Sequence, residues 1–180
     1  MIREAIKRAK QWREASKVER VHGTPHVGSY SVGQHSFDAC CLLLLLHPTL
    51  LKTLMKSDDG ALLVAVMTHD FQERYLGDLY GPAKQRYQKL AEGYEEAEAD
   101  VAQKMGLPVC DLGPKGKAWL NAVDALELQL FAEDQAAFGN RHTEQIRKRV
   151  AHRLAVGNAP QIVIDFLKYF NWTRTEEDEE

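Results

Sequence analysis

Two histidines and two aspartates are the side chains in this sequence that best suit binding of a divalent metal ion. His69 and Asp70 are adjacent at the end of an apolar run, His35 lies upstream, and Asp124 follows in another apolar stretch. Imidazole nitrogens combined with carboxylate oxygens favour zinc, manganese, iron or cobalt over calcium or magnesium alone. Helical bundles build metal sites from inward-facing side chains on separate helices. The set therefore predicts a metal site in the interior of a bundle.

Four charged residues could assist phosphate chemistry beside such a metal. Glu73 lies one helical turn after Asp70, so both carboxylates can face one pocket, and Asp78 follows soon after. Without histidine these carboxylates would suit magnesium, or they would orient an attacking water. Arg20 and Lys84 supply cations that suit phosphate oxygens. Each residue alone is more often an ordinary surface or core residue, so the hypothesis depends on their joint pattern.

The elements that must position these residues are predicted to be helices, because strand-like alternation of apolar residues is nearly absent. Ser31 is a predicted N-cap of a helix over residues 32–46, whose apolar centre makes it the expected buried helix. The His-Asp pair falls inside a predicted central helix over residues 61–75. The other predicted helices cover residues 2–18, 49–56, 82–104, 118–137, 141–156 and 161–172.

Length and composition indicate one domain. With 180 residues, 44% of them hydrophobic and 27% charged, the chain can bury a core of its own. We expect a single domain over residues 1–172 and an acidic, disordered tail over residues 173–180. The net charge of −3 argues against a nucleic-acid partner, which normally requires a basic face.

The sequence also predicts a cytoplasmic protein. Its start is charged and amphipathic, unlike a signal peptide, and the apolar run over residues 39–46 is too short to cross a bilayer. Cys40, Cys41 and Cys110 form an odd set, which is typical of reduced thiols rather than a disulfide framework. We therefore expect no membrane partner, and we also expect a homo-oligomer.

The residue pattern resembles the HD-domain phosphohydrolases, whose metal motif is written H…HD…D. It is most similar to the phage dATP triphosphohydrolases and to the related bacterial HD-domain 5′-deoxynucleotidases. The similarity runs from Arg20 to Asp124 and includes Ser31-Val32-Gly33-Gln34-His35-Ser36, His69-Asp70-x-x-Glu73, Gly77-Asp78, Pro82-x-Lys84 and Val123-Asp124-Ala125-Leu126.

This resemblance implies an all-α HD-domain helical bundle with a buried metal site. It implies catalytic roles, or a second metal such as magnesium, for Glu73 and Asp78, and phosphate binding by Arg20 and Lys84. The implied metal ligands are His35, His69, Asp70 and Asp124.

The activity that the resemblance implies is metal-dependent cleavage of the 5′-phosphoester of a 2′-deoxynucleotide. The favoured substrate is dATP or another dNTP, which would give a deoxynucleoside and triphosphate. The alternative is a 5′-deoxynucleotidase that acts on dNMPs. A phage source, and hence a location in the host cytoplasm, would follow from the resemblance alone. A remoter alternative is a non-catalytic interaction protein with a degenerate HD fold, although such a protein would lack a ligand and all four are present.

Two positions depart from the family pattern. Gln34 precedes the first histidine, where the nucleotidases commonly have glutamate. Val21 follows the pocket arginine, where those enzymes often have a tryptophan that packs against the sugar. We expect Val21 to line the sugar and base pocket, and the choice of sugar and base stays open.

Overall fold

The computed structural model of the chain describes residues 2–47, 49–50 and 60–168, and these residues are predominantly helical. Across this described part there is no β-strand, and an isolated bridge joins Glu19 and Ser31. The all-α prediction is therefore confirmed. The helices are α1 (Ile2–Ala15), α2 (Val32–Leu46), α4 (Gly60–Thr68), α5 (Glu73–Leu76), α6 (Gly81–Arg86), α7 (Gln88–Met105), α8 (Gly113–Ala137), the 3₁₀ helix η1 (Arg141–Thr143) and α9 (Glu144–Val156). Residues 161–168 are also helical.

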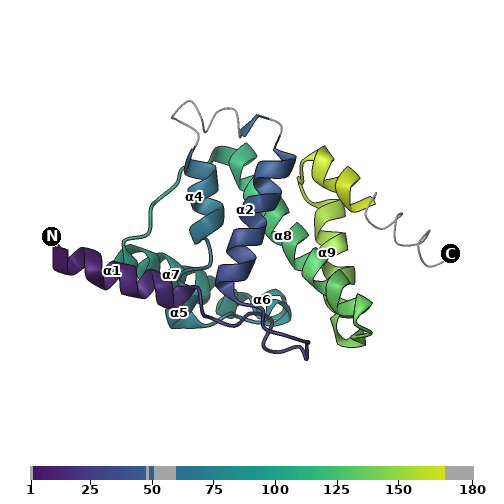
Figure 1. The fold of residues 1–180 in the computed structure, drawn as a ribbon, viewed down its shortest axis with the longest axis horizontal. Helices are drawn as coiled ribbons and strands as arrows, with labels where there is room; N and C mark the ends of the chain where they lie inside the picture. Colours follow the sequence, from purple (N-terminus) through teal and green to yellow (C-terminus); the bar gives the residue numbers. More distant parts are fainter. Residues whose placement is uncertain (1, 48, 51–59, 169–180) are drawn as a thin grey trace.

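The long helix α8 is the centre of the fold. It packs most extensively against α9 and α2, and α2 packs in turn against α4 (Figure 1). Many of these contacts are apolar, and Leu43, Val66, Val123 and Leu126 are almost entirely buried among them. Burial of each such side chain is worth about 1.5–3 kcal/mol. The core therefore fixes α2, α8 and the end of α4 relative to one another.

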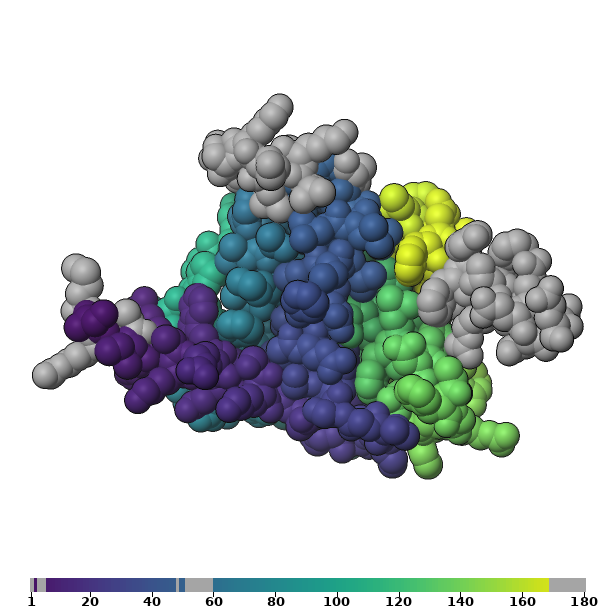
Figure 2. Space-filling model, viewed as in Figure 1, coloured from purple at the N-terminus to yellow at the C-terminus, as the bar shows by residue number. Residues whose placement is uncertain are grey.

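Helix α2 has the predicted bounds, but it is not buried on all sides. Ser31 caps it with an extended backbone, and its hydroxyl accepts a hydrogen bond from the backbone N–H of Gln34 at 3.3 Å. Phe37 and Leu45, however, are 68% and 73% exposed. Figure 2 shows α2 (blue) as part of the viewed surface. The prediction of a fully buried helix was wrong because α4 and α8 cover only part of its circumference.

The predicted central helix over residues 61–75 is interrupted at the His-Asp pair. Helix α4 ends at Thr68, residues 69–72 form turns, and α5 begins at Glu73. The turn is held by backbone hydrogen bonds from Phe71 to Thr68 at 3.1 Å and from Glu73 to Asp70 at 3.0 Å. Adjacent residues of a regular helix point about 100° apart. The turn therefore lets His69 and Asp70 direct their side chains to one point.

Other helix boundaries differ from the predictions for local reasons. The predicted helix over residues 82–104 is divided at Tyr87 into α6 and α7, and α7 ends at Gly106, which has a φ of 65°. Helix α8 begins at Gly113 rather than residue 118, and Pro114 occupies its first turn, where a missing N–H costs no hydrogen bond.

Several predicted segments fall partly or wholly outside the described residues. They are the greater part of the helix over residues 49–56, the end of the helix over residues 161–172, and the tail over residues 173–180. Within the described part, no helix combines the length and apolar character needed to cross a membrane.

Candidate metal centre and substrate cavity

The four predicted metal ligands converge. One ligand atom from each of His35, His69, Asp70 and Asp124 lies within 4.8 Å of all the others. The closest approaches are 3.2 Å from His69 Nε2 to Asp70 Oδ2 and 3.3 Å from His35 Nε2 to Asp124 Oδ1. Two imidazoles and two carboxylates around one point form a donor set that fits a divalent transition metal.

Each of these side chains is held in place by the core or by the turn. His35 is fully buried in the first turns of α2, and Asp124 lies in α8 between the buried residues Val123 and Ala125. His69 Nδ1 lies 2.7 Å from the carbonyl oxygen of Val66. Because a carbonyl oxygen only accepts, Nδ1 carries the hydrogen and Nε2 is available as a ligand.

A buried pair that the sequence reasoning missed supports His35. The carboxylate of Glu127 lies against His35 Nδ1 and accepts a hydrogen bond from the hydroxyl of Tyr30, which is also 3.1 Å from Nδ1. This contact leaves Nε2 of His35 facing Asp124. The sequence carried a signal for Glu127, since it follows Asp124 by three residues on one helical face.

The imidazoles and carboxylates of this four-residue cluster shift one another's pKa values. Burial alone would lower the pKa of His35 and of His69, but their carboxylate neighbours raise both above the usual value. Burial alone would raise the pKa of Asp124, but the two imidazoles hold it well below its usual range. A divalent cation would compete with the imidazole protons for the same atoms.

Arg20, a predicted phosphate-binding residue, is buried beside the four predicted metal ligands. It donates to Asp70 through Nη1, which is also 3.8 Å from Glu73 Oε1, and its Nη2 lies 4.0 Å from Asp124 Oδ1. Arg20 also lines the adjoining cavity. Its guanidinium therefore contacts two predicted metal ligands and also borders the cavity.

The two predicted catalytic carboxylates differ in their surroundings. Glu73 is buried, and its Oε2 has no hydrogen-bond partner among the described residues. Burial, together with neighbouring Asp70, raises the pKa of Glu73 to about 9. Asp78 instead accepts a hydrogen bond from the backbone N–H of Val21 at 2.8 Å. Val21 has a φ of 56°, which is unusual for a β-branched residue, so this hydrogen bond helps to hold a strained backbone.

A cavity of ≈ 340 Å³ adjoins the cluster. This volume lies within the range of small-molecule sites, about 300–1,000 Å³. An apolar part of its wall consists of Val21, Leu128, Ile146 and Val150. The cations that line it are Arg20, Lys84, Arg149 and Arg153. Its carboxylates are Asp70, Glu73, Asp78 and Asp124.

The predicted site residues therefore meet around one cavity. Seven of them line it directly, namely Arg20, Val21, Asp70, Glu73, Asp78, Lys84 and Asp124. His35 and His69 join it through the cluster. The two arginines of α9 were not predicted, because nothing in their local sequence distinguishes them from ordinary surface charges.

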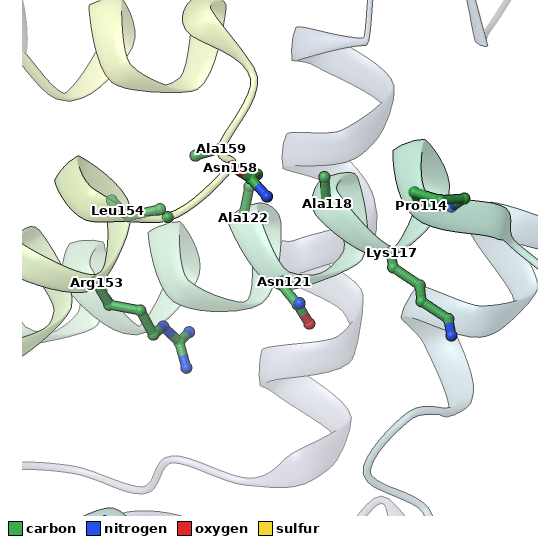
Figure 3. Close-up of a pocket in the computed structure, with 10 residues that line it drawn as sticks. Pro114, Lys117, Ala118, Asn121, Ala122, Arg153, Leu154, Asn158 and Ala159 are labelled. Atoms are coloured by element: carbon green, nitrogen blue, oxygen red, sulfur yellow. The ribbon is translucent and has the colours of Figure 1, made fainter.

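A second cavity, of ≈ 430 Å³, lies where α8 passes the end of α9 (Figure 3). The side chains of Lys117 and Asn121, from α8, and of Arg153, from α9, point to the same side of it. Arg153 lines both cavities and donates to Asp124 Oδ2 at 3.0 Å. It therefore links the second cavity to a predicted metal ligand.

Helices arranged around such a cluster define the HD-domain class, and comparison with solved structures agrees. An HD-domain phosphohydrolase from Listeria innocua superposes with a TM-score of 0.73 at 18% identity, covering 91% of this chain and 86% of that one. The protein PH0347 from Pyrococcus horikoshii gives 0.69 at 18% identity, covering 91% and 96%. The cyanophage S-2L HD phosphohydrolase DatZ, bound to dA and one catalytic Zn²⁺ ion, gives 0.63 at 18% identity, covering 94% and 96%.

The sequence places the chain more narrowly. The family described as YfbR-like 5′-deoxynucleotidases matches residues 11–109, which is more than half of the chain. The chain belongs to this YfbR-like family and is a metal-dependent phosphohydrolase. No curated protein matches its sequence. Asp124 lies beyond the matched residues, so its place in the site rests on geometry.

Proposed function

We propose that this phosphohydrolase cleaves the 5′-phosphoester of 2′-deoxynucleotides, with dATP or another dNTP as its favoured substrate. The products would then be a deoxynucleoside and triphosphate. The observation that carries the proposal is the convergence of two imidazoles and two carboxylates beside a cavity whose wall has four cationic side chains, four carboxylates and an apolar part. The cations, together with a bound metal, would suit the phosphate end of a nucleotide, and the apolar part of the wall would suit its sugar and base.

The metal ligands in this proposal are His35, His69, Asp70 and Asp124. Zinc, cobalt, manganese or iron would suit them, and the catalytic Zn²⁺ of DatZ supports zinc as a candidate. When bound, the metal would supply positive charge at the α-phosphate and lower the pKa of a water ligand. Magnesium could bind in addition at Glu73 and Asp78.

The remaining residues would bind and orient the substrate. Arg20 and Lys84 would donate charge-assisted hydrogen bonds to phosphate oxygens. The buried Oε2 of Glu73 would accept a hydrogen bond from the attacking water or help a proton reach the leaving 5′-oxygen. Asp78, which lines the cavity, would help to orient the attacking water, and Val21 would pack against the sugar.

A second candidate function is 5′-deoxynucleotidase activity on dNMPs, which would release a deoxynucleoside and phosphate. The description of the matching family favours this substrate class. The dA bound to DatZ suits either alternative, because a deoxynucleoside is the product of both reactions. The homo-oligomer, the phage source and the cytoplasmic location remain predictions.

A product assay tests both functions. Purified protein is loaded with zinc, cobalt or manganese and incubated with dNMPs, dNTPs and rNTPs, and the nucleoside and phosphate products are separated. The proposal expects deoxynucleoside and triphosphate from a dNTP, whereas the second candidate expects release of phosphate from a dNMP. The control is Asp124→Ala, which should keep its helical content but lose metal and several orders of magnitude in rate. If wild-type protein releases no deoxynucleoside with any metal, both functions are wrong.

A further inference from the structure

Arg149 occupies a position in the cavity that the functions assigned so far do not use. It lies on α9 one helical turn before Arg153, so both side chains share one face of that helix. Its guanidinium approaches the start of α6 closely, since a Cβ atom added at Gly81 would lie 3.4 Å from its Cζ and Nη2. Arg149 therefore lines the cavity from α9, with its guanidinium close to the start of α6.

The four cations of the cavity differ in their ion pairs. Arg20 pairs with Asp70, Lys84 Nζ lies 3.6 Å from Glu98 Oε1, and Arg153 pairs with Asp124 at 3.0 Å. Among the described residues, Arg149 has no carboxylate oxygen within 4.0 Å, although it is partly buried.

The surroundings of Arg149 disfavour the positive charge of its guanidinium. Burial lowers its pKa, and the positive charge of Arg153 lowers it further, against the opposing influence of Tyr80 and Asp78. An arginine nevertheless stays charged at neutral pH. A partly buried cation without a carboxylate in ion-pair contact is stabilised by an anionic ligand, which would neutralise it.

We propose that Arg149 binds the β- and γ-phosphates of a nucleoside triphosphate, and that it makes the enzyme prefer triphosphates over monophosphates. This inference rests on the proposed function, because it takes the α-phosphate to lie at the metal cluster. Arg20 and Lys84 suffice for the single phosphoryl group of a monophosphate. The two further phosphates of a triphosphate need additional donors, and a guanidinium offers several in a planar fork.

Selectivity between substrates is the first test. We measure kcat/KM for dATP and dAMP with wild-type protein, Arg149→Gln, Arg149→Lys and the control Lys148→Gln. Lys148 is the neighbouring residue on α9, its side chain is 74% exposed, and it does not line the cavity. Arg149→Gln should lower the dATP/dAMP ratio by about 10- to 100-fold, since it removes hydrogen bonds to charged groups. Arg149→Lys should recover part of the ratio because it keeps the charge, and Lys148→Gln should leave the ratio unchanged.

Binding of inorganic triphosphate provides a readout that does not depend on turnover. Calorimetric titration of the metal-loaded proteins with triphosphate and with orthophosphate should show about 10-fold or greater loss of triphosphate affinity in Arg149→Gln. Orthophosphate affinity should change little. Circular dichroism of each variant checks that the helical content is retained.

Each outcome decides the inference. The inference is overturned if wild type cleaves only dAMP. It is also overturned if Arg149→Gln leaves the dATP/dAMP ratio unchanged, including the case in which both substrates lose rate equally, as expected if Arg149 contacts the base. If wild type cleaves neither substrate, the proposed function fails. In that case the triphosphate titration still decides whether Arg149 binds a polyphosphate.

Discussion

The carboxylate of Glu127 lies against Nδ1 of His35 in the core, although the two residues are 92 positions apart in the chain. The contact joins α8 to α2 and fixes the direction of the imidazole, so that Nε2 lies 3.3 Å from Asp124 Oδ1. A carboxylate at this position also increases the basicity of a histidine ligand. Glu127 is therefore a positioning residue for the predicted metal site.

We predict that Glu127→Gln weakens metal binding while the protein keeps its fold. Loss of a partner of this kind typically costs about 10- to 100-fold in metal affinity. Tyr30→Phe should have a smaller effect, because Glu127 still contacts His35 after the hydroxyl is removed. The measurement is competitive titration with a chelator, with Glu96→Gln as the control on the exposed surface of α7. Wild-type affinity in Glu127→Gln would show that the contact does not support a metal ligand.

The sequence singled out the four residues that converge in the structure, because their chemistry is distinctive and their spacing matches a family motif, and their role as metal ligands stays a prediction. It did not predict the geometry that brings His69 and Asp70 together. An apolar run favours a continuous helix, whereas the native chain turns after Thr68 because tertiary contacts override local propensity. The arginines of α9 were missed for a different reason, since only the packing of α9 against α8 brings them to the cavity.

The two predicted catalytic carboxylates should be separable from the metal ligands. Glu73→Ala and Asp78→Ala should each retain a tightly bound transition metal but lose rate, because neither residue belongs to the four-residue cluster. Loss of a positioned acid or base costs about 10²- to 10⁴-fold in rate. Metal content by elemental analysis and kcat for the preferred nucleotide check this. Absence of the metal from both variants would show that the ligand assignment is wrong.

A stability prediction concerns the glycine two positions before His35. A Cβ atom at Gly33 would lie 2.8 Å from both Cβ and the carbonyl oxygen of Ser16, whose position is fixed by a 3.0 Å hydrogen bond from the Gly33 N–H. Gly33→Ala should therefore lower the free energy of unfolding by about 1–3 kcal/mol. Gly93 lies in α7, where an added Cβ would meet no atom within 4 Å beyond its chain neighbours and the backbone of its own helix, so Gly93→Ala should instead stabilise by up to about 1 kcal/mol. Denaturant unfolding compares the two, and equal effects would contradict the close approach.

Sugar selectivity should depend on Val21. This side chain lines the cavity, packs against the core and has no hydrogen-bonding group, so it can discriminate only by shape. Shape discrimination of this kind is worth about 1–3 kcal/mol, or about 10- to 200-fold. If Val21 packs against C2′ and excludes a 2′-hydroxyl, Val21→Ala should raise kcat/KM for ATP relative to dATP by about 10-fold or more. The alanine variant keeps the backbone N–H that binds Asp78, so the wall of the cavity should stay in place.

The control for this measurement is Lys84→Gln rather than a variant of Arg20. Arg20 contacts Asp70, so its replacement would disturb the predicted metal site as well as phosphate binding. Lys84 makes no contact with the cluster; its Nζ lies near Glu98 and 4.2 Å from the ring centroid of Tyr94. Because every nucleotide presents phosphate oxygens, Lys84→Gln should lower kcat/KM for ATP and dATP by similar factors. A ratio in Val21→Ala equal to that of wild type would exclude this residue from the sugar pocket and direct attention to Leu128, Ile146 and Val150.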